Sequence, residues 1–149
     1  MIRHGHGRMM DEADVIRLEL PATHKYLNVL GACITEMLSR VDGLQAVSVV
    51  AYNVQLAVHE TCTNIVEHAY GGAPDGRIAI TLTLTSAPRL MVVDVHDTGR
   101  SFDPSSVPDP DLERGQIHGY GIFLMHSLMD DVAYETQADG NHWRLVKHL

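Results

Sequence analysis

The feature that most constrains the fold of this chain is the strict alternation of apolar and polar residues over 77–85. A period of two predicts a strand with one buried side and one solvent-facing side. A second apolar run follows at 90–96, and the two runs predict an antiparallel hairpin. A sheet that buries one face needs a second layer to cover it. The alternating apolar residues are Ile78, Ile80, Leu82 and Leu84.

Two amphipathic helices are predicted ahead of this hairpin, and they can supply that layer. Residues 22–40 carry apolar side chains at helical spacing, namely Leu27, Leu30, Ile34 and Leu38. Residues 44–70 form a second helix, which Gly71 and Gly72 end. Its apolar face consists of Val47, Ala51, Val54, Val58, Cys62, Ile65 and Ala69, and its polar face of Asn53, Glu60, Asn64 and Glu67.

The remaining patterns complete the set of elements. Residues 14–20 predict an edge strand, and residues 97–118 have no periodicity and predict a long functional loop. A third helix follows Gly119-Tyr120-Gly121, and a final hairpin joins 132–135 to 143–149. This order predicts an α+β fold, a two-layer α/β sandwich with helices on one face of a mixed, mainly antiparallel sheet.

Length and composition fit one domain over 14–149 behind a flexible tail over 1–13. The chain has 149 residues, with 11 basic and 19 acidic side chains and a net charge of −8, which argues against a nucleic-acid surface. Its two lysines, Lys25 and Lys147, follow no glycine-rich loop, so a Walker-type phosphate loop is excluded. No apolar run reaches the roughly 18 residues of a membrane span. The two cysteines form no CxxC pair, so we expect a reduced, cytoplasmic protein.

Glu60 and Asn64 are the first pair of residues suited to chemistry. They are four residues apart, so a helix places them on one face. A carboxylate can accept a proton from a hydroxyl, and a carboxamide oxygen can bind a hard cation such as Mg²⁺. The alternative is a solvated helix face. A zinc site of the HExxH type does not follow, because Thr63 occupies the position of its second histidine.

Two glycine-containing segments add further candidates. Asp97-Thr98-Gly99 comes directly after a strand, where an aspartate can accept a hydrogen bond from the exocyclic amine of adenine and a glycine leaves room for a flat ring. The alternative there is a β-turn. Gly119-Tyr120-Gly121 opens a helix, whose exposed amides can bind a phosphate. The alternative there is an ordinary helix start.

Together and in this order, these segments resemble the motifs of the GHKL, or Bergerat-fold, ATPases. Residues 59–70 resemble the N box of that family, residues 97–104 its G1 box and residues 119–125 its G2 box. Three further stretches resemble the anti-sigma-factor serine kinase branch, namely Glu-His-Ala-Tyr at 67–70, Phe-Asp-Pro at 102–104 and Leu-Met-Asp-Asp-Val at 128–132. The resemblance implies the Bergerat ATP-binding fold.

The resemblance also implies a role for each matching residue. Glu60 would be the general base, and Asn64 would hold Mg²⁺ on the triphosphate of ATP. Asp97 would contact the adenine amine, with Gly99 beneath the ring. The G2 residues would lie at the phosphates, and they are Gly119, Tyr120 and Gly121.

At three positions the resemblance to the family does not settle the role of the residue. Arg114, in the stretch that would form the ATP lid, is a candidate to stabilise the terminal phosphate, and the alternative is a solvated loop arginine. Ser101 stands where the wider family often has a second G1 glycine. Asn141 stands nearest to a threonine that many relatives place by the last strand, and we assign it no role.

The function implied by the resemblance is that of an ATP- and Mg²⁺-dependent protein serine/threonine kinase in transcription regulation. It would transfer the γ-phosphate to a serine of an anti-anti-sigma (STAS-type) partner and sequester a sigma factor. One alternative is a non-catalytic ATP/ADP-binding regulatory module that sequesters a partner protein. Another is an α/β domain that binds no nucleotide. A homodimer is implied by the resemblance only.

Overall fold

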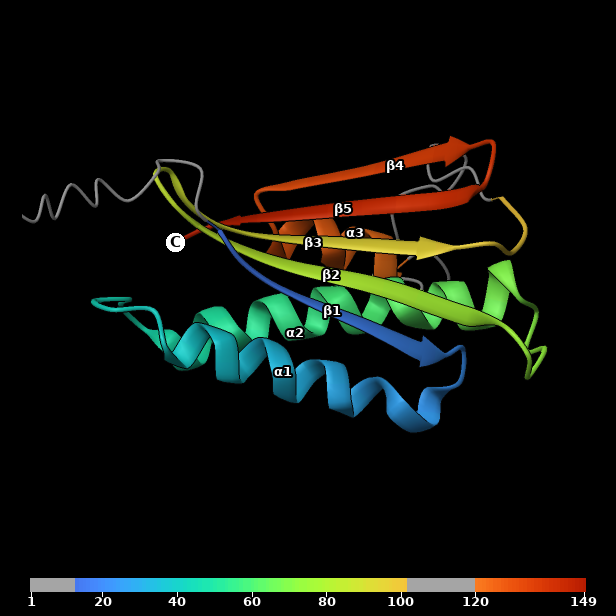
Figure 1. Ribbon diagram of the computed structural model, residues 1–149, viewed down its shortest axis with the longest axis horizontal. Helices are drawn as coiled ribbons and strands as arrows, with labels where there is room; N and C mark the ends of the chain where they lie inside the picture. Colours follow the sequence, from blue (N-terminus) through green and yellow to red (C-terminus); the bar gives the residue numbers. More distant parts are fainter. Residues whose placement is uncertain (1–12, 102–119) are drawn as a thin grey trace, which may run out of the picture.

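The computed structural model describes residues 13–101 and 120–149, and these residues form a sheet with helices packed against it (Figure 1). Residues 1–12 of the tail predicted over 1–13, and most of the predicted loop, lie outside the described residues. The strands are β1 (Asp14–Pro21), β2 (Arg77–Ser86), β3 (Arg89–Asp97), β4 (Asp131–Gln137) and β5 (Gly140–His148). The helices are η1 (His24–Tyr26), α1 (Leu27–Ser39), α2 (Val47–Asn64), η2 (Ile65–Ala69) and α3 (Tyr120–Leu128).

The five strands form one sheet in the order β1-β2-β3-β5-β4. All four pairings among these strands are antiparallel, so the described sheet is antiparallel throughout rather than mixed. The predicted hairpin is confirmed as β2 and β3, and β1 lies at an edge of the sheet as predicted. The final hairpin is also confirmed, as β4 and β5. Both strands extend closer to the turn than the pattern indicated, so the turn between them is shorter.

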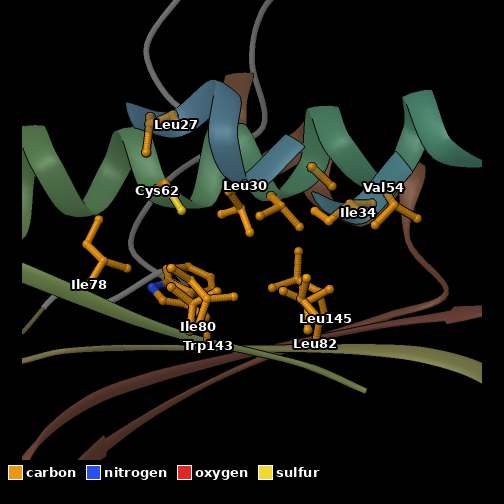
Figure 2. Close-up of a cluster of buried hydrophobic side chains, with 14 of the residues drawn as sticks. Leu27, Leu30, Ile34, Val54, Cys62, Ile78, Ile80, Leu82, Trp143 and Leu145 are labelled. Carbon is orange, nitrogen blue, oxygen red and sulfur yellow. The ribbon is translucent and has the colours of Figure 1, made fainter. Parts of the chain in front are cut away.

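The helices cover one face of the sheet, and the hydrophobic core lies between the two layers (Figures 1 and 2). Helix α2 packs against α1 on one side and against α3 on the other, and it also contacts β5. Ile78, Ile80 and Leu82 of β2 are buried in this core, and Leu84 packs half-buried against it, as the alternation predicted. Fully buried members of the core from both layers include Ile34, Val54, Cys62, Ile78, Leu82 and Leu145.

The predicted second helix divides into two kinds of helix. Helix α2 ends at Asn64, and η2 continues as a wider π-helical turn in which the Tyr70 N–H donates to the Ile65 carbonyl at 3.0 Å. The predicted apolar face is confirmed over most of its length, because Ala51, Val54, Val58, Cys62 and Ile65 are buried. Short π-helical turns inside helices are rare and are often found at functional sites. In the described ranges, no helix combines the length and apolarity that a membrane crossing requires.

Replacing Leu82 with alanine is expected to lower the free energy of unfolding by about 2–5 kcal/mol. The side chain of Leu82 is fully buried between the layers, so its removal leaves a cavity. Urea denaturation measures the change as a lower midpoint at an unchanged m value. Thr83→Ala is the matched control, because Thr83 faces away from the helices, and it should cost less than about 1 kcal/mol. Equal losses in the two variants would contradict a one-sided core.

Candidate functional site

Glu60 lies on the last turns of α2, where α3 begins beside it. A β-carbon built on Gly121 would lie 2.7 Å from Oε2 of Glu60, so the absence of a side chain at this position lets α3 approach the carboxylate. At the next residue of α2, the Thr61 hydroxyl donates to the Ala57 carbonyl at 2.9 Å and lies 2.9 Å from the sulfur of Met125 on α3. The predicted polar face of α2 is therefore partly covered by α3 rather than fully solvated.

Asn64, the last residue of α2, has a buried side-chain amide. Its Nδ2 atom has no hydrogen-bond partner within the described residues. Asn64 and Asp97 line one small cavity of about 10 Å³, together with Trp143 on β5 and residues of η2. The cavity lies where the end of α2 faces the end of β3. An unpaired buried amide is the kind of group that can hydrogen-bond to a polar ligand.

Asp97, the last residue of β3, is buried with 4% of its surface exposed. Two donors reach the same carboxylate oxygen, Oδ1: the Gly99 N–H at 2.9 Å and the Asn141 side-chain amide at 2.9 Å. Burial raises the pKa of Asp97, while the hydrogen bonds from Asn141 and Gly99 oppose that rise. Neither of these two hydrogen bonds occupies the second oxygen, Oδ2.

Gly99 is held against the end of η2. A β-carbon at this position would lie 2.5 Å from the carbonyl oxygen of Ala69, and the next residue, Arg100, donates its N–H to that same oxygen at 2.7 Å. A side chain at position 99 would therefore push the loop away from the helix. This close contact with Ala69 is a structural reason for a glycine at position 99, in addition to the predicted one. The position of Gly99 beneath a purine ring stays a prediction.

Tyr70 and Asn141 hold this loop in place, and neither was assigned a role from the sequence. The Tyr70 hydroxyl accepts the Thr98 N–H at 2.9 Å and donates to the Arg77 carbonyl at 2.6 Å. Asn141 lies directly opposite Asp97 in the β3–β5 pairing. In the sequence, the only indication of a role for Tyr70 is its position at the end of the stretch that resembles the N box. A role for Asn141 could have been predicted only from the register of β3 and β5, which the sequence alone leaves open.

The structure thus brings most of the described candidates to one end of the molecule. Glu60 meets Gly121, and Asn64 shares a cavity with Asp97, to which Gly99 is bonded. Tyr120 begins α3, where its ring lies 6.0 Å from that of Phe123. Two candidates, Arg114 and Gly119, lie outside the described residues.

The donor set fits Mg²⁺ delivered with a nucleotide rather than a metal held by protein alone. Among the described residues there is no group of three or more His, Cys, Asp or Glu side chains that could hold a metal ion. Mg²⁺ in nucleotide sites takes one or two protein oxygens and completes its shell with phosphate and water. The side-chain oxygen of Asn64 can supply such a ligand, and its unpaired amide is consistent with a polar neighbour that arrives with the ligand.

Comparisons with known proteins identify relatives of this chain. Residues 20–147 match the family model described as "Histidine kinase-like ATPase domain". The chain is 33% identical over 129 residues to serine-protein kinase RsbW of Listeria monocytogenes, covering 80% of this chain and 78% of the relative. It is 29% identical over 142 residues to serine-protein kinase RsbW of Bacillus subtilis, covering 87% and 83%.

A solved structure shows the same fold. The crystal structure of the RsbU and RsbW domains of Rv1364c from Mycobacterium tuberculosis aligns with a TM-score of 0.65 at 19% identity, over 91% of this chain and 32% of that one. The family model spans most of the chain, and the first relative is aligned over more than two thirds of its length. The chain therefore belongs to the histidine kinase-like ATPase family and, within it, to the relatives of serine-protein kinase RsbW.

Proposed function

We propose that this protein binds Mg-ATP and transfers the γ-phosphate to a serine of a STAS-type anti-anti-sigma protein, and that it sequesters a sigma factor in a competing complex. Such a circuit regulates transcription in the cytoplasm. The observation that carries the proposal is the meeting of Glu60 with the start of α3, next to a cavity that Asn64 shares with Asp97. The family membership supports the kinase class, and the homodimer stays a prediction.

The nucleotide is held by three kinds of contact in this proposal. Asp97 accepts a hydrogen bond from the exocyclic amine of adenine, beside the loop that Gly99 keeps close to η2. The N-terminus of α3 faces the phosphates, since free backbone N–H groups at a helix start bind anions and Gly121 adds no side chain there. Asn64 holds the Mg²⁺ ion, which neutralises charge on the triphosphate when it is bound.

Glu60 acts as the general base. Its carboxylate, which no hydrogen bond from the described residues occupies, orients the incoming serine and takes up the hydroxyl proton as the oxygen attacks the γ-phosphorus. The bond from the γ-phosphorus to the β–γ bridging oxygen breaks in the same displacement, and ADP leaves with that electron pair. Phosphoryl transfer depends mainly on positioning and charge stabilisation, so a carboxylate fixed beside the phosphate-binding helix start is well placed for this role. Arg114 keeps its predicted role at the terminal phosphate, and Gly119 keeps its predicted place beside the phosphates.

Incubation with γ-labelled ATP, Mg²⁺ and the STAS-type partner tests the proposal. We expect label on a serine of the partner, identified by mass spectrometry of the phosphorylated peptide. The control is the same partner with that serine replaced by alanine, which should stay unlabelled. Nucleotide binding without any transfer would contradict the kinase and would support a non-catalytic module.

Glu60→Gln is expected to keep Mg-ATP binding within about threefold and to lower the rate of transfer by at least about 100-fold. The amide retains the shape of the side chain but cannot accept the proton. Calorimetry measures the affinity, and a phosphoserine assay measures the rate. Glu67→Gln is the matched control, because Glu67 is an exposed acid further along the same helical stretch. Transfer at the wild-type rate in Glu60→Gln would remove the general-base role.

Asn64→Ala is expected to weaken the binding of Mg-ATP by about tenfold or more, since the variant loses the oxygen assigned to Mg²⁺. Titration calorimetry with and without Mg²⁺ separates a loss of metal contact from a general loss of affinity. The matched control is Asn53→Ala, which removes a similar side chain from α2 three turns away. An unchanged dependence of affinity on Mg²⁺ in Asn64→Ala would exclude the residue as the metal ligand.

A further inference from the structure

Asn141, on β5, is a buried side chain that makes several hydrogen bonds beside the end of β3. It is 2% exposed, and its Nδ2 atom donates to Oδ1 of Asp97 at 2.9 Å and to the Gly99 carbonyl at 3.0 Å. Its own oxygen accepts the Ser101 hydroxyl at 2.8 Å. Carboxylate and carbonyl oxygens are acceptors only, so these two partners fix which end of the amide faces them.

The backbone brings Asn141 to this place. Position 141 pairs with Asp97 across β3 and β5, and both side chains point to the helix side of the sheet. A β-carbon on the preceding residue, Gly140, would overlap the Asp97 carbonyl, and the φ of Gly140 is 143°. Glycine at this position therefore permits the close approach of the two strands that sets the amide against the carboxylate.

We propose that Asn141 makes the nucleotide site selective for a 6-amino purine, because it holds one carboxylate oxygen of Asp97 and leaves the other to accept the amine. This inference rests on the proposed function, in which Asp97 receives the adenine amine. It gives a specificity-determining role to a residue that positions Asp97 and need not contact the base.

The charge of Asp97 explains how the selectivity arises. A buried carboxylate stays ionised only when donors offset the cost of burial, and Asn141 and the Gly99 N–H are the donors here. An ionised carboxylate accepts from the amine of adenine and repels the C6 carbonyl of hypoxanthine. A neutral carboxylic acid carries an O–H that can donate to that carbonyl, so it distinguishes the two bases poorly.

The test compares Asn141→Val with Asn141→Thr, a pair with nearly the same shape that differs in one hydroxyl donor. Both residues suit a strand, and thermal unfolding checks that both variants are folded. Calorimetry with Mg²⁺ gives the affinities of ADP and of inosine diphosphate, which has a carbonyl in place of the amine. The quantity compared is the ratio of the two affinities, which a general loss of stability would not change selectively.

We expect the wild-type chain to favour ADP by at least about tenfold, Asn141→Val to lower that ratio by about tenfold and Asn141→Thr to retain more of it. Equal ratios in the two variants overturn the inference, because the hydroxyl is their difference. A wild-type ratio in Asn141→Val overturns it as well, and in that case the proposed role of Asp97 stands. A wild-type chain that binds both nucleotides equally overturns the role of Asp97 itself.

Discussion

The burial of one face of an antiparallel sheet under three helices is the constraint on which the rest of this structure depends. Each fully buried branched side chain in that core, such as Leu82 or Leu145, contributes about 1.5–3 kcal/mol. Helix α2 must lie between α1 and α3 to complete the layer. The C-terminal end of α2 brings Glu60 to the start of α3 and Asn64 to the end of β3.

At that end of the molecule, the loop after β3 is held by hydrogen bonds rather than by apolar packing. The Ala69 carbonyl accepts the Arg100 N–H, and the Tyr70 hydroxyl joins Thr98 to the start of β2. The π-helical turn of η2 leads into both contacts. The carboxylate of Asp97, at the end of β3, is held by hydrogen bonds from this loop and from β5, and a fixed side chain is what the proposed recognition of a flat base requires. The rigid sandwich thus supports a polar site at its edge.

Local sequence patterns predicted much of this fold. The features that they did not predict depend on pairing between segments that are distant in the sequence. The hairpin of β2 and β3 and the apolar face of α2 follow from periods of two and 3.6, which neighbouring residues determine. The π-helical turn after Asn64, the uniformly antiparallel sheet and the place of Asn141 depend on contacts between distant segments. Gly99 was singled out for a ligand, but its tightest neighbour is the backbone of Ala69, which no spacing rule contains.

The two carboxylates of the site differ in their surroundings, and this difference suits them to different tasks. Asp97 is buried and receives two hydrogen bonds on one oxygen, so it is fixed in place and ready to accept a single further donor. Glu60 is half-buried beside Gly121, and no described residue donates to it. A base must be free to take up a proton, whereas a recognition group must not move or change charge. On these grounds we propose Glu60, and not Asp97, as the residue that accepts the serine proton.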